Sequence, residues 1–229
     1  MPLGLIAAIA ACPAIVGTNE AIQTSQKQQA KERHRGRKMN LIVSCVDASS
    51  RKSRDVSGCY IILKGGRLFA ATIPEDNTSS DIRAENNMSP PGHLFQGYYF
   101  KHPDYTWTKG EGLVSTISDD PPMLNWIYVD KETYSVKYGT RKESEGNYLG
   151  PWDCTPVAKR LTFEGWEGFC IAEEKDDELR RMGLWGLYFD CDDNGLREKV
   201  DTDRRVLEVE LVRREMRLPP TEEENGEPE

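Results

Sequence analysis

The sequence has few histidines and no apolar run long enough to cross a bilayer as a helix. Only three His occur in 229 residues, which leaves little material for a histidine-rich metal centre. The longest uncharged apolar run, Leu3–Val16, has fourteen residues, whereas a membrane-spanning helix needs about 20. The composition therefore excludes a polytopic membrane protein.

Several catalytic signatures are also missing. The chain has no Gly-x-Ser-x-Gly nucleophile elbow, no His-Glu-x-x-His motif and no glycine-rich phosphate loop. Its six cysteines include no Cys-x-x-Cys pair, which argues against a zinc ribbon or a thioredoxin-like site. The residues favour a non-catalytic protein, and they identify no catalytic residue.

Charge is distributed unevenly along a chain whose formal net charge is -8. Residues 1–38 hold six Lys or Arg against two Glu, and residues 219–229 hold five Glu and no base. The body between them, residues 39–218, therefore carries a net charge of -7. Because nucleic-acid-binding domains present a basic face, we expect no nucleic-acid partner.

The body is rich in short apolar segments typical of β-strands. Hairpins are predicted where Tyr60–Leu63 and Leu68–Ile73 flank Gly65-Gly66, and where Trp126–Val129 and Tyr134–Tyr138 flank Asp130–Thr133. Alternation along Tyr134, Val136 and Tyr138 predicts a half-buried strand. Further strands are expected at Asn40–Val46, Phe95–Phe100, Leu113–Ile117, Arg160–Phe163, Gly168–Glu173, Leu184–Phe189 and Val206–Arg214. About ten short strands and little helix predict a mainly β fold, a single antiparallel barrel or sandwich.

Three regions follow from these patterns. Residues 1–38 form an apolar and basic N-terminal segment that is expected to be helical, and residues 39–218 form the β-rich domain. The polar stretch 74–92 predicts a mobile insertion in that domain, and residues 219–229 predict a disordered acidic tail. No internal repeat is found.

Parts of the chain resemble a family of small filamentous-fungal proteins. The stretches that carry the resemblance are Met1–Thr18, His34–Arg37, Pro91–His93, Leu161–Gly168 and Leu187–Asp190. The resemblance spans most of residues 1–218. It implies a fungal source and a recurrent architecture, and it transfers no activity, ligand or catalytic residue.

The N-terminal region allows an interpretation as a membrane-surface anchor. An apolar segment too short to span a bilayer can lie in its interface, while the basic cluster that follows attracts anionic lipids. Palmitoylation of Cys12 would strengthen the attachment. The residues assigned to the membrane are Leu3, Ile6, Ile9, Cys12, Ile15, Lys27, Lys31, Arg33, Arg35, Arg37 and Lys38.

Two other interpretations of this region stay open. A secretory signal is the minority alternative, because no basic residue precedes the apolar run and cleavage after Ala14 would leave five cysteines, an odd number. Sequons at Asn77 and Asn87 favour secretion slightly. Alternatively, the apolar segment packs as a helix on the β-rich body. The anchor interpretation predicts a cytoplasmic, peripheral membrane protein.

The most specific local motif begins at Asp190 and resembles the opening of a calcium-binding loop of the EF-hand type. Its candidate oxygen ligands are Asp190, Asp192, Asn194, Glu198 and Asp201. Arg197 stands where such a loop needs an apolar residue, and the preceding segment predicts a strand where an EF-hand has a helix. A tight turn is therefore favoured over calcium binding, and Ca²⁺ is the one cofactor suggested.

Aromatic and acidic side chains of the body offer weaker candidates. The aromatic set is Tyr98, Tyr99, Phe100, Trp107, Trp126 and Trp152, which would either fill the core or line a ligand cavity. A cavity would have a polar group such as His102, Asp104 or Glu164 at its wall. Glu164 and Glu167 flank Trp166, an arrangement that favours a turn over an acid/base pair.

The leading hypothesis is a non-catalytic, β-rich binding or scaffold protein held at a cytoplasmic membrane surface by its N-terminus. One alternative is a small barrel that binds an apolar metabolite and acts as an isomerase or tailoring enzyme. A second alternative is a calcium-responsive binding module.

Overall fold

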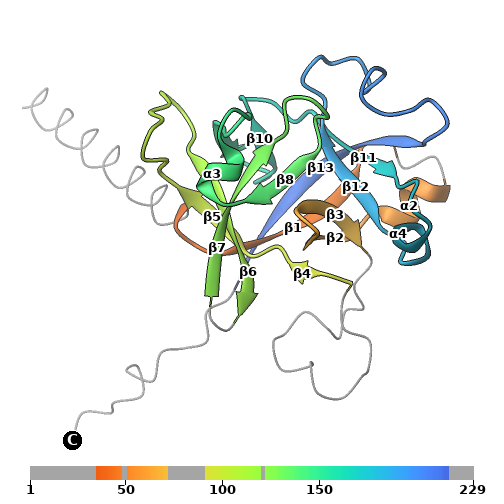
Figure 1. Cartoon of the computed structure of the whole chain (residues 1–229), viewed down its shortest axis with the longest axis horizontal. Helices are drawn as coiled ribbons and strands as arrows, with labels where there is room; N and C mark the ends of the chain where they lie inside the picture. The colour runs from red at the N-terminus through yellow and green to blue at the C-terminus, as the bar shows by residue number, and fades with distance from the viewer. Residues whose placement is uncertain (1–34, 48–50, 72–90, 120–121, 217–229) are drawn as a thin grey trace, which may run out of the picture. The chain divides into compact units, whose positions relative to one another are not determined.

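The computed structural model describes residues 35–47, 51–71, 91–119 and 122–216 (Figure 1). The chain divides into two compact units, Met1–Arg37 and Lys38–Glu229. The N-terminal helix, most of the insertion and the acidic tail that the sequence predicts all lie outside the described residues. Within the described ranges, no helix is both long and apolar enough to cross a membrane.

The second unit consists mainly of short strands. In chain order the elements are β1 (Met39–Cys45), α2 (Arg51–Val56), β2 (Tyr60–Lys64), β3 (Arg67–Ala71), β4 (His93–Leu94), β5 (Gly97–Phe100), β6 (Gly112–Asp119), β7 (Pro122–Val129), β8 (Val136–Gly139), α3 (Arg141–Ser144), β9 (Trp152–Cys154), β10 (Leu161–Phe163), β11 (Phe169–Glu173), α4 (Asp177–Arg181), β12 (Trp185–Phe189) and β13 (Val206–Glu215).

The described strands close into an antiparallel barrel. Nine of them follow one another around the ring in the order β12, β11, β13, β1, β5, β6, β7, β8 and β3, and β3 pairs back with β12. Strand β2 pairs with both β1 and β3, which also closes a tighter ring of six strands. In Figure 1, β1 and β13 run side by side, although β1 is the first strand of the unit in the sequence and β13 the last. The prediction of a mainly β fold is thereby confirmed, and of the two predicted alternatives, barrel and sandwich, the barrel is the correct one.

Both predicted hairpins are present. Gly65 and Gly66 have φ angles of 55° and 80°, the positive values that a tight two-residue hairpin turn requires. In the β7–β8 hairpin, the Asp130 side chain accepts hydrogen bonds from the backbone N–H groups of residues 132 and 133. Tyr134, with a φ of 58°, belongs to this turn. The predicted alternation from Tyr134 is therefore wrong at its start, because β8 begins only at Val136.

The described helices α2, α3 and α4 were not predicted. They have only four to six residues each, which is too short to show an apolar periodicity. Local hydrogen bonds hold two of them. Thr140 and Glu143 form a capping box at α3, and the Asp176 carboxylate accepts two backbone N–H groups at α4.

Large aromatic side chains fill the barrel. Trp152, Phe163, Phe169 and Phe189 are at most 1% exposed, and their ring centroids lie 4.6 to 5.1 Å apart at three contacts. Tyr99 belongs to the same core. For Tyr99 and Trp152, packing in the core is therefore the correct one of the two predicted alternatives.

A buried ion cluster fastens the barrel where β3 meets β12. Glu174, which follows β11, is 8% exposed and accepts hydrogen bonds from both terminal nitrogens of Arg67, at 2.7 and 3.2 Å. Arg204 donates to the same carboxylate at 3.4 Å, and both guanidinium groups donate to the Tyr188 hydroxyl. A Cβ atom at Gly186 would clash with Glu174 Oε1 and Arg67 Nη2, so a larger residue there would force the side chains of the cluster to shift.

Candidate functional site

Six rings form an unbroken chain of contacts on β5, β7 and the loop between β5 and β6. From one end to the other they belong to Tyr98, Phe100, Trp126, His102, Tyr105 and Trp107, and we call this set the aromatic surface. Successive ring centroids lie 6.2, 5.9, 4.6, 4.9 and 5.6 Å apart. Phe100 is 49% exposed and Tyr105 48%, so solvent reaches the rings at two separate places.

Strand geometry explains how the first rings come together. Side chains alternate between the two faces of a strand, so Tyr98 and Phe100 share the face opposite the buried Tyr99. Tyr98 on β5 lies opposite Val114 on β6, and Val114 lies opposite Trp126 on β7. The Tyr98 and Trp126 rings are therefore on the same face of the sheet. Opposite Phe100 stands Gly112, where a Cβ atom would lie 2.6 Å from the Trp126 indole.

His102 lies at the centre of the aromatic surface. Its Nδ1 accepts a hydrogen bond from the backbone N–H of Asp104 at 3.1 Å, so the proton of the neutral imidazole resides on Nε2. Burial lowers the pKa of His102, and Arg141 lowers it as well, while Asp104 raises it. Because the net direction is downward, the imidazole is neutral at neutral pH. Asp104 and Arg141 form an ion pair beside it.

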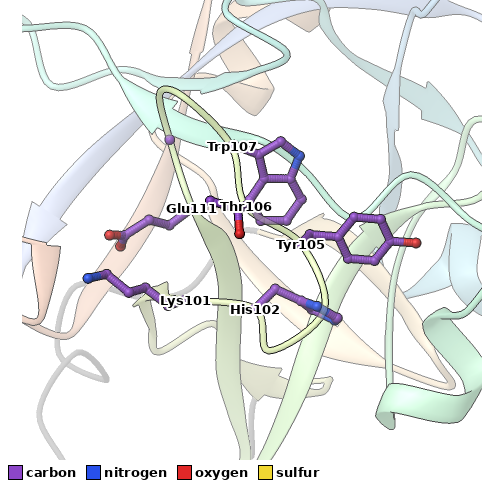
Figure 2. A pocket seen from close by; sticks show the side chains of 7 residues that line it. Lys101, His102, Tyr105, Thr106, Trp107 and Glu111 are labelled. Atoms are coloured by element: carbon purple, nitrogen blue, oxygen red, sulfur yellow. The ribbon is translucent and has the colours of Figure 1, made fainter.

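A pocket of about 180 Å³ opens beside Tyr105 and Trp107 (Figure 2). Its lining residues are Lys101, His102, Tyr105, Thr106, Trp107, Gly110 and Glu111. The Tyr105 and Trp107 rings are stacked with an interplanar angle of 8°. Lys101 and Glu111 also line the pocket, and in Figure 2 their side chains extend in the direction opposite to the Tyr105 ring. The pocket thus has an aromatic wall and a charged wall.

Contacts with β9 and with the segment just before it hold this pocket in place. The backbone N–H and C=O of Glu111 both pair with Trp152, at 2.9 and 2.8 Å. At Gly150 a Cβ atom would lie 3.1 Å from the Trp107 indole, so the indole rests directly on the backbone there. Since Trp152 is fully buried, the loop that carries the pocket is anchored to the core.

The five candidate calcium ligands lie within the described residues, in the loop after β12. The Asp190 Oδ2 atom accepts the backbone N–H of Gly195 at 2.6 Å, and Asn194 accepts that of Arg197. Asp201 forms an ion pair with Lys175 at 2.7 Å. These contacts are typical of a tight turn.

One observation favours the binding of an ion or small molecule by this loop. The second oxygen of Asp190, Oδ1, is buried without a hydrogen-bond partner. However, no group of three or more His, Cys, Asp or Glu side chains is placed to hold a metal ion in the part of the chain that the structure describes. Calcium binding through Asp190, Asp192, Asn194, Glu198 and Asp201 stays a prediction.

The acidic pair around Trp166 belongs to a turn between β10 and β11. Glu164 and Gly165 have φ angles of 51° and 91°, and the Trp166 ring packs against Phe189 at 5.1 Å. The Glu167 carboxylate is held by Arg160 at 2.7 Å. The turn is therefore the correct alternative, although Trp166 is 36% exposed.

No disulfide joins the five cysteines that the structure describes, at positions 45, 59, 154, 170 and 191. Burial is the main cause that raises the pKa of Cys170 and of Cys191 to about 12, and neighbouring carboxylates such as Asp190 add to it. Both thiols are therefore protonated at neutral pH, which makes them poor nucleophiles.

Sequence reasoning found part of the aromatic surface and missed its arrangement. It named Tyr98, Phe100, Trp107 and Trp126, but it expected them in the core or around a cavity of the barrel. It did not single out Tyr105. The alternation at residues 98–100 was the available signal, because it places two rings on the face opposite the core.

Comparison with known proteins gives a family for this chain. A family of fungal β-trefoil domains matches residues 17–217, a range that includes the barrel and the whole aromatic surface. No curated protein and no solved structure gives a significant match. The resemblance to a fungal family is confirmed. The chain belongs to the fungal β-trefoil domain family.

Proposed function

We propose that this protein is a non-catalytic binding protein and that the aromatic surface is its ligand-binding face. The observation that carries the proposal is the unbroken chain of six ring contacts, half open to solvent at Phe100 and Tyr105. Aromatic side chains are enriched where proteins bind ligands and partners, because they bury a large area at a small loss of conformational entropy. A pocket with both apolar and charged walls adjoins these rings.

The side chains near this surface support binding more than catalysis. His102 is neutral and 6% exposed, and its Nδ1 is already engaged with a backbone N–H group. The Asp104 carboxylate is paired with Arg141. A general base must reach the proton that it removes. On His102 the nitrogen that could accept a proton, Nδ1, is engaged by a backbone N–H, and the Asp104 carboxylate, although its side chain is 51% exposed, is paired with Arg141.

A screen of chemically diverse small molecules by ligand-observed NMR tests this proposal. We expect the compounds that bind to lose their signal in a Phe100→Ala/Tyr105→Ala double variant, because both rings are exposed and support no core packing. Trp166→Ala is the matched control, since it removes another partly exposed ring from a different turn. Compounds that bind all three proteins equally would contradict the proposal.

We further propose that residues 1–38 hold this binding domain at the cytoplasmic face of a membrane. The support is the sequence alone: a short apolar segment from Leu3 to Ile15 and a basic cluster from Lys27 to Lys38. Of the eleven residues assigned to the membrane, only Arg35, Arg37 and Lys38 lie within the described ranges.

Co-sedimentation with vesicles tests the membrane proposal. We expect the full chain to bind vesicles that contain anionic phosphatidylserine, with each basic residue near the surface contributing about 1 kcal/mol. A Lys27→Glu/Lys31→Glu variant loses two such contributions, about 2 kcal/mol, and should bind at least about thirtyfold more weakly. Equal sedimentation of the two proteins, or no sedimentation of the full chain, would contradict the anchor.

A further inference from the structure

We infer that the aromatic surface binds a proline-rich segment of a partner protein, in the polyproline II conformation and flanked by basic residues. This inference rests on the proposed binding function and names the chemistry of the partner. Three features of the molecule carry it: the angles between neighbouring rings, ring N–H groups that meet no acceptor, and the acidic charge of the domain.

Most neighbouring rings of the aromatic surface lie at steep angles to one another. His102 and Tyr105 meet edge to face at 63°, and the planes of His102 and Trp126 differ by 54°. The planes of Phe100 and Trp126 differ by 57°. Rings at such angles form an uneven surface instead of one flat plane. Domains that recognise polyproline II helices use grooves lined by aromatic side chains, against which the proline rings pack.

The pocket beside Tyr105 and Trp107 is small, and the apolar face continues beyond it. Its volume of about 180 Å³ is below the range of roughly 300–1,000 Å³ that is typical for drug-sized ligands. The rings continue from His102 to Trp126 on β7. Leu124, two residues before Trp126 and therefore on the same face of the strand, is 50% exposed. We therefore expect an elongated ligand that places one small ring in the pocket and covers the strand beside it.

Three ring N–H groups of the aromatic surface meet no acceptor among the residues that the structure describes. They are the indole N–H groups of Trp107 and Trp126 and the buried Nε2–H of His102. Indole nitrogens only donate, so the surface suits a ligand that offers acceptors. A proline residue has a carbonyl acceptor and no N–H group, and the carbonyls of a polyproline II helix form no internal hydrogen bonds. An ordinary peptide would also bury N–H groups against this donor-rich face, which is unfavourable.

The charge of the domain selects among partners that could cover an apolar face. Residues 39–218 carry a net charge of -7, and beside the rings Asp104 and Arg141 neutralise each other in an ion pair. An acidic domain repels anionic lipid headgroups and the phosphates of nucleic acids, and it attracts basic residues. Because proline itself is uncharged, this attraction acts on arginine or lysine residues next to the proline segment. The charge therefore favours a basic protein segment over a lipid surface at this face.

The test is a calorimetric titration of the full chain with synthetic peptides. The probes are decaproline, decaproline with two arginines at one end, and the arginine-flanked peptide with every third proline replaced by alanine or by N-methylglycine. We expect both proline peptides to bind, the arginine-flanked one several-fold more tightly at low salt, with a difference that shrinks as salt is added. Alanine brings in N–H groups and should weaken binding about tenfold, whereas N-methylglycine has none and should retain most of the affinity.

Variants of the protein locate the site. Tyr105→Ala should weaken binding of the arginine-flanked peptide about tenfold, because it removes an exposed ring against which a proline would pack. Trp126→Phe keeps an aromatic ring but removes the indole N–H, and it should weaken binding about fivefold, the equivalent of one hydrogen bond. Trp166→Ala, the matched control, should bind like the natural protein. Circular dichroism checks that each variant is folded.

The outcomes separate this inference from the proposed function. If no proline peptide binds, if the alanine peptide binds as tightly as its parent, or if Tyr105→Ala leaves the affinity unchanged, the proline inference is overturned. It is also overturned if the full chain forms a dimer that Phe100→Ala/Tyr105→Ala dissociates, because the face then binds a second copy. In each of these cases the aromatic surface remains the binding face if compounds of the small-molecule screen still depend on it. If neither peptides nor compounds depend on these rings, both proposals fall.

Discussion

Replacement of Glu174 by glutamine tests how the barrel is closed. The substitution removes the only negative charge that Arg67 and Arg204 share in this cluster, while it keeps the size of the side chain. Breaking a buried ion pair by removing one partner costs about 3–5 kcal/mol. Arg67 is 25% exposed, so water offsets part of this loss, and we expect Glu174→Gln to lower the free energy of unfolding by about 2–3 kcal/mol.

Thermal unfolding followed by circular dichroism measures this effect. For a domain of this size, a loss of 1 kcal/mol lowers Tm by about 2–4 °C, so the variant should melt roughly 4–12 °C below the natural protein. Asp201→Asn is the control, because it breaks the exposed pair with Lys175 and should leave Tm unchanged. An equally small shift for Glu174→Gln would refute the reasoning, since it would mean that solvent already screens the cluster.

Three further predictions follow from single contacts. Gly112→Ala would place a Cβ atom 2.6 Å from the Trp126 indole. It should therefore destabilise the protein by about 1–3 kcal/mol and shift its tryptophan fluorescence. Unchanged stability and unchanged emission would argue against the close approach. Burial would raise the pKa of Asp130, but hydrogen bonds from Lys137 and Thr133 outweigh it and lower the pKa to about 2 from 3.8. The charged carboxylate therefore stabilises the fold above pH 4, and this contribution is lost as the pH falls toward 2. Denaturant melts should show the Asp130→Asn variant about 2 kcal/mol less stable than the natural protein near pH 7, and the difference should close at acid pH. A difference that stays constant with pH would contradict the assignment. The calcium hypothesis predicts a calcium-specific rise in Tm that vanishes in Asp190→Ala, and a melt that is the same in calcium, magnesium and chelator would leave the loop as a turn.

Local sequence patterns were enough to predict both hairpins and most of the strands, but not the short strands β4 and β9. The Gly65-Gly66 turn and the apolar runs on both sides of it specify β2 and β3 without reference to the rest of the chain. The closure of the barrel could not be predicted in this way. It depends on pairings such as β1 with β13, which join segments far apart in the sequence and are selected by packing. The β-trefoil family was also not predicted, because the sequence shows no repeat.

One feature of the core and one of the site show why a local pattern alone is insufficient. Arg213 stands on the inward face of β13 and is 6% exposed, with its guanidinium 4.9 Å from the Tyr99 ring centroid. Arginine side chains are mostly exposed in proteins, and here the cation–π contact makes burial tolerable. Likewise, the Trp107 indole that stacks with Tyr105 rests on the backbone at Gly150, which belongs to a segment about forty residues further along the chain.

The most direct test of the account is a spectrum that reports on single tryptophans. The indole N–H signals of Trp107, Trp126, Trp152 and Trp166 can be resolved by ¹H–¹⁵N NMR and assigned with Trp→Phe variants. When a bound compound is titrated, the account predicts that the signals of Trp107 and Trp126 move while those of Trp152 and Trp166 stay. Movement confined to Trp166, or binding that moves none of these signals, would contradict the claim that the aromatic surface is the binding face.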